Sequence, residues 1–109
     1  SDNAIVGEWY STAETFEFQS DGDVIHSDSS VVGWRVQDGD LLLQSAENEE
    51  YEYYFKYQIS NEFLFIAPYE ADLRTVSDND CVVLSGDANA TNQSYWDVVI
   101  LNPPEWCNV

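Results

Sequence analysis

The most regular pattern of hydrophobic and polar positions in the chain runs through residues 51–59. One parity of this stretch carries only aromatic and aliphatic side chains, namely Tyr51, Tyr53, Phe55, Tyr57 and Ile59. Side chains of a β-strand alternate between two faces, whereas a helix would scatter these aromatic residues around its circumference. The pattern therefore predicts a long strand with one dry face, as in an antiparallel sheet that is buried on one side.

Turn signals divide the first seventy residues into similar short segments. We expect strands at 5–10, 14–19, 24–27, 31–37, 41–45, 51–59 and 62–67. Asp21-Gly22 and Asp38-Gly39 mark two hairpins, because glycine adopts a positive φ at little cost. Pro68 ends the last of these strands, since proline has no amide hydrogen for the ladder. This order predicts an all-β, antiparallel up-and-down meander.

The chain has 109 residues, a length that predicts a single domain. Within it we expect a meander at 5–67, an acidic connection at 68–94, and a closing strand with a tail at 95–109. The closing strand is assigned to the apolar run 95–101, and residues 81–84 are a further candidate for a short strand. No stretch approaches the roughly 20 apolar residues of a membrane-spanning helix. Because the chain begins with serine, we expect that a signal or anchor segment has been removed.

Acidic residues dominate the charge: 21 Asp and Glu against 3 Lys and Arg give a formal net charge of −18. This balance argues against nucleic-acid binding, which needs Lys and Arg for the phosphates, and disfavours anionic membrane surfaces. The aromatic content of 15% argues against disorder. Two explanations stay open: halophilic or marine adaptation, which we prefer, and divalent cations held by carboxylates.

Cys81 and Cys107 are the only cysteines, which are too few for a cysteine-based zinc site. We predict a disulfide between them, worth roughly 3.5 kcal/mol for a loop of this length. Two free buried thiols are the alternative. A disulfide would favour an extracellular or cell-surface location.

Two acceptor triplets for N-glycosylation lie between the cysteines, Asn89-Ala90-Thr91 and Asn92-Gln93-Ser94. Asn89 and Asn92 are therefore predicted glycosylation sites, and they point to the same location as the predicted disulfide.

Gly7-Glu8-Trp9 resembles the Gly-x-Trp opening of the lipocalins. Over residues 5–67 the order of motifs is similar to that of small lipocalin-like domains of secreted microbial proteins. The further matching motifs are Phe16 and Phe18 before Asp21-Gly22, Trp34-Arg35-Val36 before Asp38-Gly39-Asp40-Leu41, and Tyr53, Tyr57 and Ile59 before Leu64 and Ile66. The resemblance implies a small β-barrel of about eight strands that binds a small apolar molecule. The chain departs from it in its short tail, and neither Arg35 nor Arg74 lies in the motif of the family's basic residue.

The aromatic residues expected inside the barrel form the candidate ligand site: Phe16, Phe18, Trp34, Tyr53, Phe55, Tyr57 and Phe65. The alternative, which we prefer, is that they fill the barrel, because an eight-stranded barrel has room for one small ligand at most. Asp78-Asn79-Asp80 is the best metal candidate, although we predict neither a metal site nor a cofactor. His26 is the only histidine and lies beside no nucleophile motif, so no catalytic residue is predicted.

These patterns together predict a secreted or cell-surface, non-enzymatic binding or accessory domain. Its partner, a small molecule or a protein, is not identified by the sequence, and we expect a monomer that neither binds nucleic acid nor inserts into a membrane. A structural protein-interaction domain with a filled core is one alternative. A hydrolase that uses carboxylates is the other.

Overall fold

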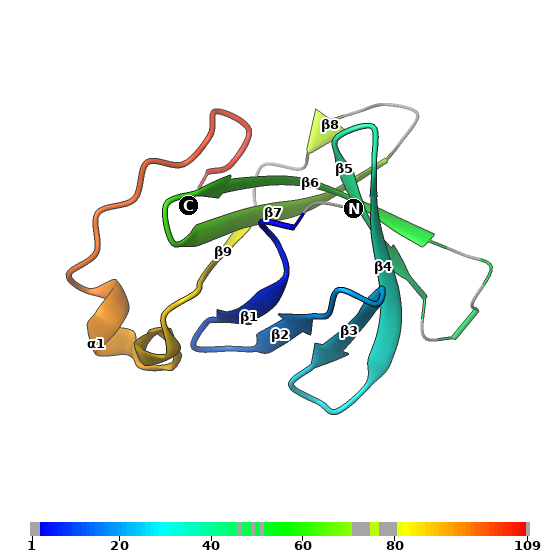
Figure 1. Cartoon of the computed structure of the whole chain (residues 1–109). Coiled ribbons are helices and arrows are strands. Elements are labelled where there is room, and N and C mark those ends of the chain that lie inside the picture. Colours follow the sequence, from blue (N-terminus) through cyan, green and yellow to red (C-terminus); the bar gives the residue numbers. More distant parts are fainter. Residues whose placement is uncertain are drawn as a thin grey trace.

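The computed structural model describes residues 3–45, 47, 48, 50, 52–70, 75, 76 and 81–108. Within these residues the strands are β1 (Gly7–Tyr10), β2 (Thr15–Phe18), β3 (Asp23–His26), β4 (Val31–Gln37), β5 (Asp40–Gln44), β6 (Glu52–Ser60), β7 (Phe63–Glu70), β8 (Thr75–Val76) and β9 (Val82–Ser85). A short 3-10 helix, η1 (Ala88–Thr91), and a one-turn α-helix, α1 (Gln93–Trp96), follow β9 (Figure 1).

The strands other than β8 close into an antiparallel barrel. Hydrogen-bonded neighbours follow the order β6-β5-β4-β3-β2-β1-β9-β7, and β7 pairs in turn with β6. β8 pairs with the end of β7 at Tyr69 and Glu70. Apart from β8, each strand therefore lies beside the next one along the chain, which confirms the predicted up-and-down meander.

The seam between β1 and β9 is much shorter than the others. Only Tyr10 and Ser85 pair across it. The remaining neighbours share between three pairs, as in β2 with β3, and six, as in β6 with β7. The barrel is thus closed, but a single residue pair joins β1 to β9.

The two predicted Asp-Gly turns form as expected. Asp38 and Gly39 have φ angles of 53° and 82°, and they link β4 directly to β5. Two successive positive φ angles match the twist of a tight hairpin. Gly22 has a φ of 94° between β2 and β3, where the Asp21 side chain accepts a hydrogen bond from Asp23 N at 3.0 Å. Local turn chemistry thereby fixes the register of both hairpins.

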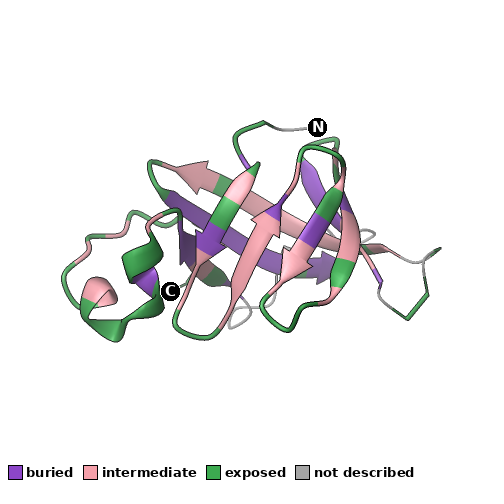
Figure 2. Ribbon diagram, turned by 60° about the horizontal axis from the view of Figure 1, so that its bottom comes forward, coloured by how far each residue is buried: buried purple, intermediate pink, exposed green. Residues whose placement is uncertain are grey.

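Hydrophobic side chains line the barrel interior and pack against one another. The buried members of this core are Ile5, Trp9, Phe18, Val24, Trp34, Leu41, Leu64, Ile66 and Leu84. Half-buried side chains that pack against them are Phe16, Val32, Val36, Leu43, Phe55, Tyr57 and Ile59. Figure 2 shows that buried residues lie mainly in the strands and that exposed residues lie mainly in the turns. Burial of each large side chain contributes about 1.5–3 kcal/mol to folding.

β7 is apolar on both faces. Leu64 and Ile66 point into the barrel, and Phe63, Phe65 and Ala67 belong to a second hydrophobic cluster outside it. The expected position of Phe65 on the interior wall is therefore wrong. A strand that is buried on both faces has no polar alternation from which its inward parity could be read.

Residues 86–108 form what we call the C-terminal cap, which lies against the outer face of β7 and β9. Its contribution to the second cluster comes from Tyr95, Trp96, Val99, Leu101, Trp106 and Cys107. Tyr95 and Ser85 hydroxyls are hydrogen-bonded at 2.8 Å, and the Trp96 indole nitrogen donates to Ala90 O at 2.7 Å. Because Trp96 also packs 6.1 Å from the Phe63 ring, the cap is a packed second layer over the barrel.

The expected closing strand at 95–101 is wrong. Gln93–Trp96 is helical, residues 97–106 contain no strand, and β9 closes the barrel instead, from the other segment marked as a strand candidate. The physical reason is that β9 pairs with both β7 and β1, which leaves no free ladder in the ring. The apolar run is therefore buried outside the barrel.

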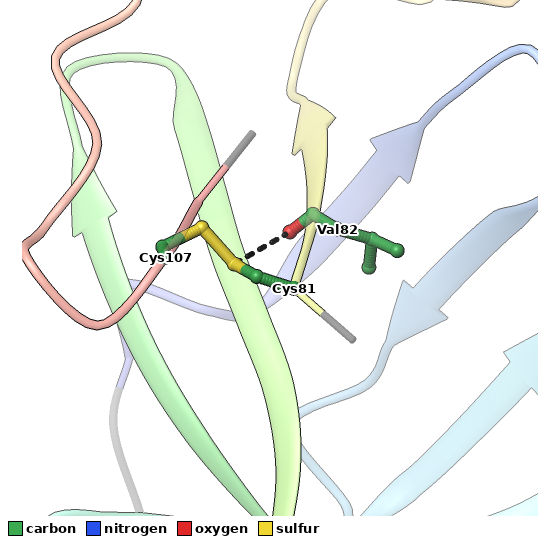
Figure 3. Close-up of a disulfide and its surroundings, with 3 residues drawn as sticks. All are labelled: Cys81, Val82 and Cys107. Atoms are coloured by element: carbon green, nitrogen blue, oxygen red, sulfur yellow. Dashed lines mark hydrogen bonds between the residues drawn. A yellow bond between two sulfur atoms is a disulfide. The ribbon is translucent and has the colours of Figure 1, made fainter. Parts of the chain in front are cut away.

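The predicted disulfide is confirmed. Cys81 and Cys107 are bonded, with their Cα atoms 5.2 Å apart, and the Cys81 sulfur lies 3.8 Å from Val82 O (Figure 3). The bond joins the residue before β9 to the end of the C-terminal cap. It therefore anchors the last part of the chain to the barrel wall.

Candidate functional site

The predicted aromatic wall is divided between three environments. Phe18 and Trp34 are buried in the interior, where Phe16, Phe55 and Tyr57 are half-buried. The remaining two members lie elsewhere: Phe65 belongs to the outer cluster, and the Tyr53 side chain is 51% exposed. Tyr53 lies near the start of β6, opposite Leu43, so the expectation that it lines a dry interior is wrong.

The indole groups inside the barrel already have hydrogen-bond partners. Trp34 Nε1 donates to Gln19 O at 2.8 Å, and its ring meets Phe18 edge to face with centroids 5.5 Å apart. Trp9 Nε1 donates to Ile5 O at 2.8 Å, and Ile5 is itself fully buried in the core. The segment before β1 therefore helps to fill the interior, and neither indole is left to orient a ligand.

His26 lies between two carboxylates. Its Nε2 is 2.8 Å from a Glu14 oxygen, its Nδ1 is 3.3 Å from an Asp28 oxygen, and its ring packs 4.7 Å from that of Phe16. Burial by itself lowers the pKa of His26, but its hydrogen bonds to the Glu14 and Asp28 carboxylates and their negative charges outweigh this effect, so the pKa is raised. Since each ring nitrogen faces a carboxylate, this histidine is not placed to activate a nucleophile.

Two of the shallow hollows on the described surface include candidate site residues. One, of about 190 Å³, is lined by Gly22, Gly33, Trp34, Arg35, Gln44 and Glu52. The other, of about 150 Å³, is lined by Glu8, Tyr10, Thr15, Phe16, Glu17, Ile25 and His26. Both are below the roughly 300 Å³ at which ligand pockets begin.

The first hollow is spanned by an ion pair. Arg35 Nε and Nη2 each donate to a Glu52 oxygen at 2.7 Å, and Arg35 also donates to Gln37. This hydrogen bonding raises the pKa of the Arg35 guanidinium and lowers the pKa of the Glu52 carboxyl. The pair joins the outer faces of β4 and β6, and we interpret it as a structural contact.

Asn89 and Asn92, the predicted glycosylation sites, are both exposed. Asn89 lies in η1, where its N–H donates to the Asp87 side chain at 2.9 Å. Asn92 separates η1 from α1, and its side chain makes no cap hydrogen bond. The geometry leaves both side chains accessible, and glycosylation itself stays a prediction.

Metal and membrane sites were tested on the described residues only. They contain no group of three or more His, Cys, Asp or Glu side chains arranged to hold a metal ion. The candidate Asp78-Asn79-Asp80 lies outside these residues. The same residues include no helix that is long and apolar enough to cross a membrane.

Sequence reasoning missed one surface feature. In residues 98–102, which we call the exposed edge, the Val98 and Ile100 side chains are 79% and 85% exposed. Val99 and Leu101, which alternate with them along the chain, pack into the outer cluster. Alternation along a strand would have predicted that residues 98–101 have two faces. Because all four residues are aliphatic, it could not predict that one of these faces is exposed to solvent.

The chain matches no protein-family model, and searches of curated proteins and of solved structures return no match. Functional conclusions therefore follow from the geometry of the described residues.

Proposed function

We propose that this protein is a non-enzymatic, lipocalin-like accessory domain of the cell exterior that acts as a protein-interaction module through its outer surface. The observation that carries this proposal is the hydrophobic interior, in which Trp9, Phe18 and Trp34 pack with thirteen other hydrophobic side chains. An eight-stranded barrel holds one small ligand at most, and we infer that side chains packed in this way leave no room for it. Binding is then assigned to the outside of the barrel.

Three features support the location and the form of the domain. A disulfide such as Cys81–Cys107 is typical of oxidising compartments. The acceptor residues Asn89 and Asn92 are exposed. Gly7 and Trp9, which carry the lipocalin resemblance, lie on β1, and Trp9 is part of the core.

The filled interior is tested with a neutral apolar fluorophore, N-phenyl-1-naphthylamine, because an anionic dye would be repelled by a protein of charge −18. We expect no saturable fluorescence increase with the wild-type protein. Leu41→Ala is the positive control, since removal of a fully buried leucine opens an apolar cavity that can take up a small apolar molecule. Saturable, stoichiometric binding by the wild type would overturn the proposal.

A carrier of a small apolar molecule is the second candidate. It is favoured by β6, whose interior-facing Phe55 and Tyr57 are only half-buried and whose Tyr53 is 51% exposed. In that case the wild type binds the neutral fluorophore with saturation, and Tyr53→Ser weakens the binding. The same titration thus separates the two candidates.

A further inference from the structure

The exposed edge, residues 98–102, begins in a turn, where Val98 N donates to Tyr95 O at 3.4 Å, and residues 99–102 belong to no helix or strand. No backbone hydrogen bond joins Val99, Ile100, Leu101 or Asn102 to any other residue of the described chain. Figure 1 shows the segment after α1 running along the outside of the molecule. An extended backbone with free N–H and C=O groups is a template for an added strand.

The side chains of the exposed edge are arranged as in an edge strand. Val99 and Leu101 anchor it to the cluster around Phe63 and Phe65, and the disulfide at Cys107 fixes the chain shortly after it. Val98 and Ile100 point outward with almost their whole surface in water. The segment is therefore anchored to the barrel by Val99 and Leu101. Burial within this chain does not account for the aliphatic side chains of Val98 and Ile100.

The electrostatic surroundings of this segment select the kind of partner. Residues 86–108 contain Asp87, Asp97 and Glu105 and no lysine, arginine or histidine. Burial raises the pKa of the Tyr95 phenol, the Ser85 hydrogen bond lowers it, and the charges of Glu62 and Asp87 raise it, with a net increase. The cap thus carries three acidic side chains and no basic one, within a chain of charge −18.

We propose that the exposed edge binds an extended segment of a partner protein in which apolar residues alternate with lysine or arginine. The added strand pairs with the backbone of residues 99–102, covers Val98 and Ile100 with its apolar side chains, and places its cations beside the acidic groups of the cap. A second copy of the chain fits less well, because it brings a further charge of −18 to the contact. This inference rests on the proposed function, whose binding surface and partner chemistry it specifies.

The probe is a seven-residue peptide that alternates lysine and valine, measured by calorimetry at moderate salt. The protein variant is Val98→Ser with Ile100→Ser, and the matched control is Val31→Ser, an aliphatic residue on β4 that is 57% exposed. We expect the edge variant to lose about tenfold or more in affinity and the control to bind as the wild type does, because anchoring side chains of an interface carry most of its affinity.

The backbone pairing is tested with the same peptide methylated at alternate amide nitrogens, which keeps its charge and removes donors. We expect weaker binding of the methylated peptide, and slower amide hydrogen exchange at 99–102 when the unmodified peptide binds. Equal binding of both peptides, or of the edge variant, would show general attraction to an acidic surface and overturn the proposal. Absence of any peptide binding would overturn it as well.

Self-association is examined by sedimentation in 1 M salt, where charge repulsion is screened. A dimer that Ile100→Ser abolishes would replace the proposed occupant with a second copy of this chain. The fluorophore titration is independent of these measurements. Suppose that the exposed edge does not bind the peptide and the protein does not bind the fluorophore. This inference is then overturned, whereas the proposal of a filled core still stands.

Discussion

His26 shows how a single residue can give the barrel a dependence on pH. It lies between Glu14 and Asp28, and its pKa in the folded protein is above the ordinary value of 6.5. The protonated ring is thus favoured by folding. Its stabilising contribution is fully present below the unfolded-state pKa and is lost as the pH rises through the higher folded-state pKa.

We therefore expect His26→Gln to reduce stability more at about pH 5.5 than at about pH 8.5. Urea denaturation of wild type and variant at both values measures this, and the difference between the two proteins cancels the general titration of carboxylates. Asp28 does not move within this window, because hydrogen bonds from Ser30, together with His26, lower its pKa to about 2. An equal loss at the two pH values would contradict the assignment.

Residue parity predicted part of the interior. Phe18 and Trp34 are buried where the alternation of their strands placed them. Phe65 was misplaced because β7 is apolar on both faces, so its sequence carries no inward parity. Tyr53 has the parity of Phe55 but lies near the start of β6, and position along a strand is not encoded in alternation.

At the scale of elements, the C-terminal cap is the part that sequence patterns describe least well. The run 95–101 has the length and composition of a strand, and only the pairing of β9 with both of its neighbours excludes it from the ring. Which of two segments pairs with β1 and β7 depends on contacts between residues that are far apart in the sequence, and local patterns do not report these contacts. The hairpins, whose Asp-Gly turns act locally, were predictable for the opposite reason.

The Cys81–Cys107 disulfide links the C-terminal cap covalently to the barrel. We expect the double variant Cys81→Ser and Cys107→Ser to lose about 3.5 kcal/mol of stability, because the loop that the bond closes gains entropy in the unfolded state. Chemical denaturation gives this value. The tryptophan emission of the variant should shift to the red, since Trp96 and Trp106 pack in the cap.

Reduced wild-type protein is the matched control, because it lacks the bond but keeps both cysteine side chains. It should behave as the double variant does. If both retain wild-type stability and emission, packing alone holds the cap and the disulfide has no stabilising role.

At the scale of the whole molecule, the charge of −18 opposes the compact state. The length over which charges act falls from about 10 Å at 0.1 M salt to about 3 Å at 1 M. We therefore expect the melting temperature to rise as sodium chloride is added over this range. Differential scanning fluorimetry measures the rise, which would support the proposed adaptation to salt.

Calcium chloride at matched ionic strength separates screening from cation binding. Equal shifts with the two salts indicate screening. A larger shift with calcium would favour divalent cations held by carboxylates, and a melting temperature that does not respond to either salt would contradict both explanations.

The single pair at Tyr10 and Ser85 has a consequence for the order of folding. From β1 to β7 the sheet can grow by adding each hairpin to the previous one, with short loops and little entropy to overcome. The seam must instead join positions 10 and 85 along the chain, so we expect it to close last. The barrel therefore forms from a sheet of successive hairpins that closes at the β1–β9 seam. We expect the same seam to be the first to open during unfolding.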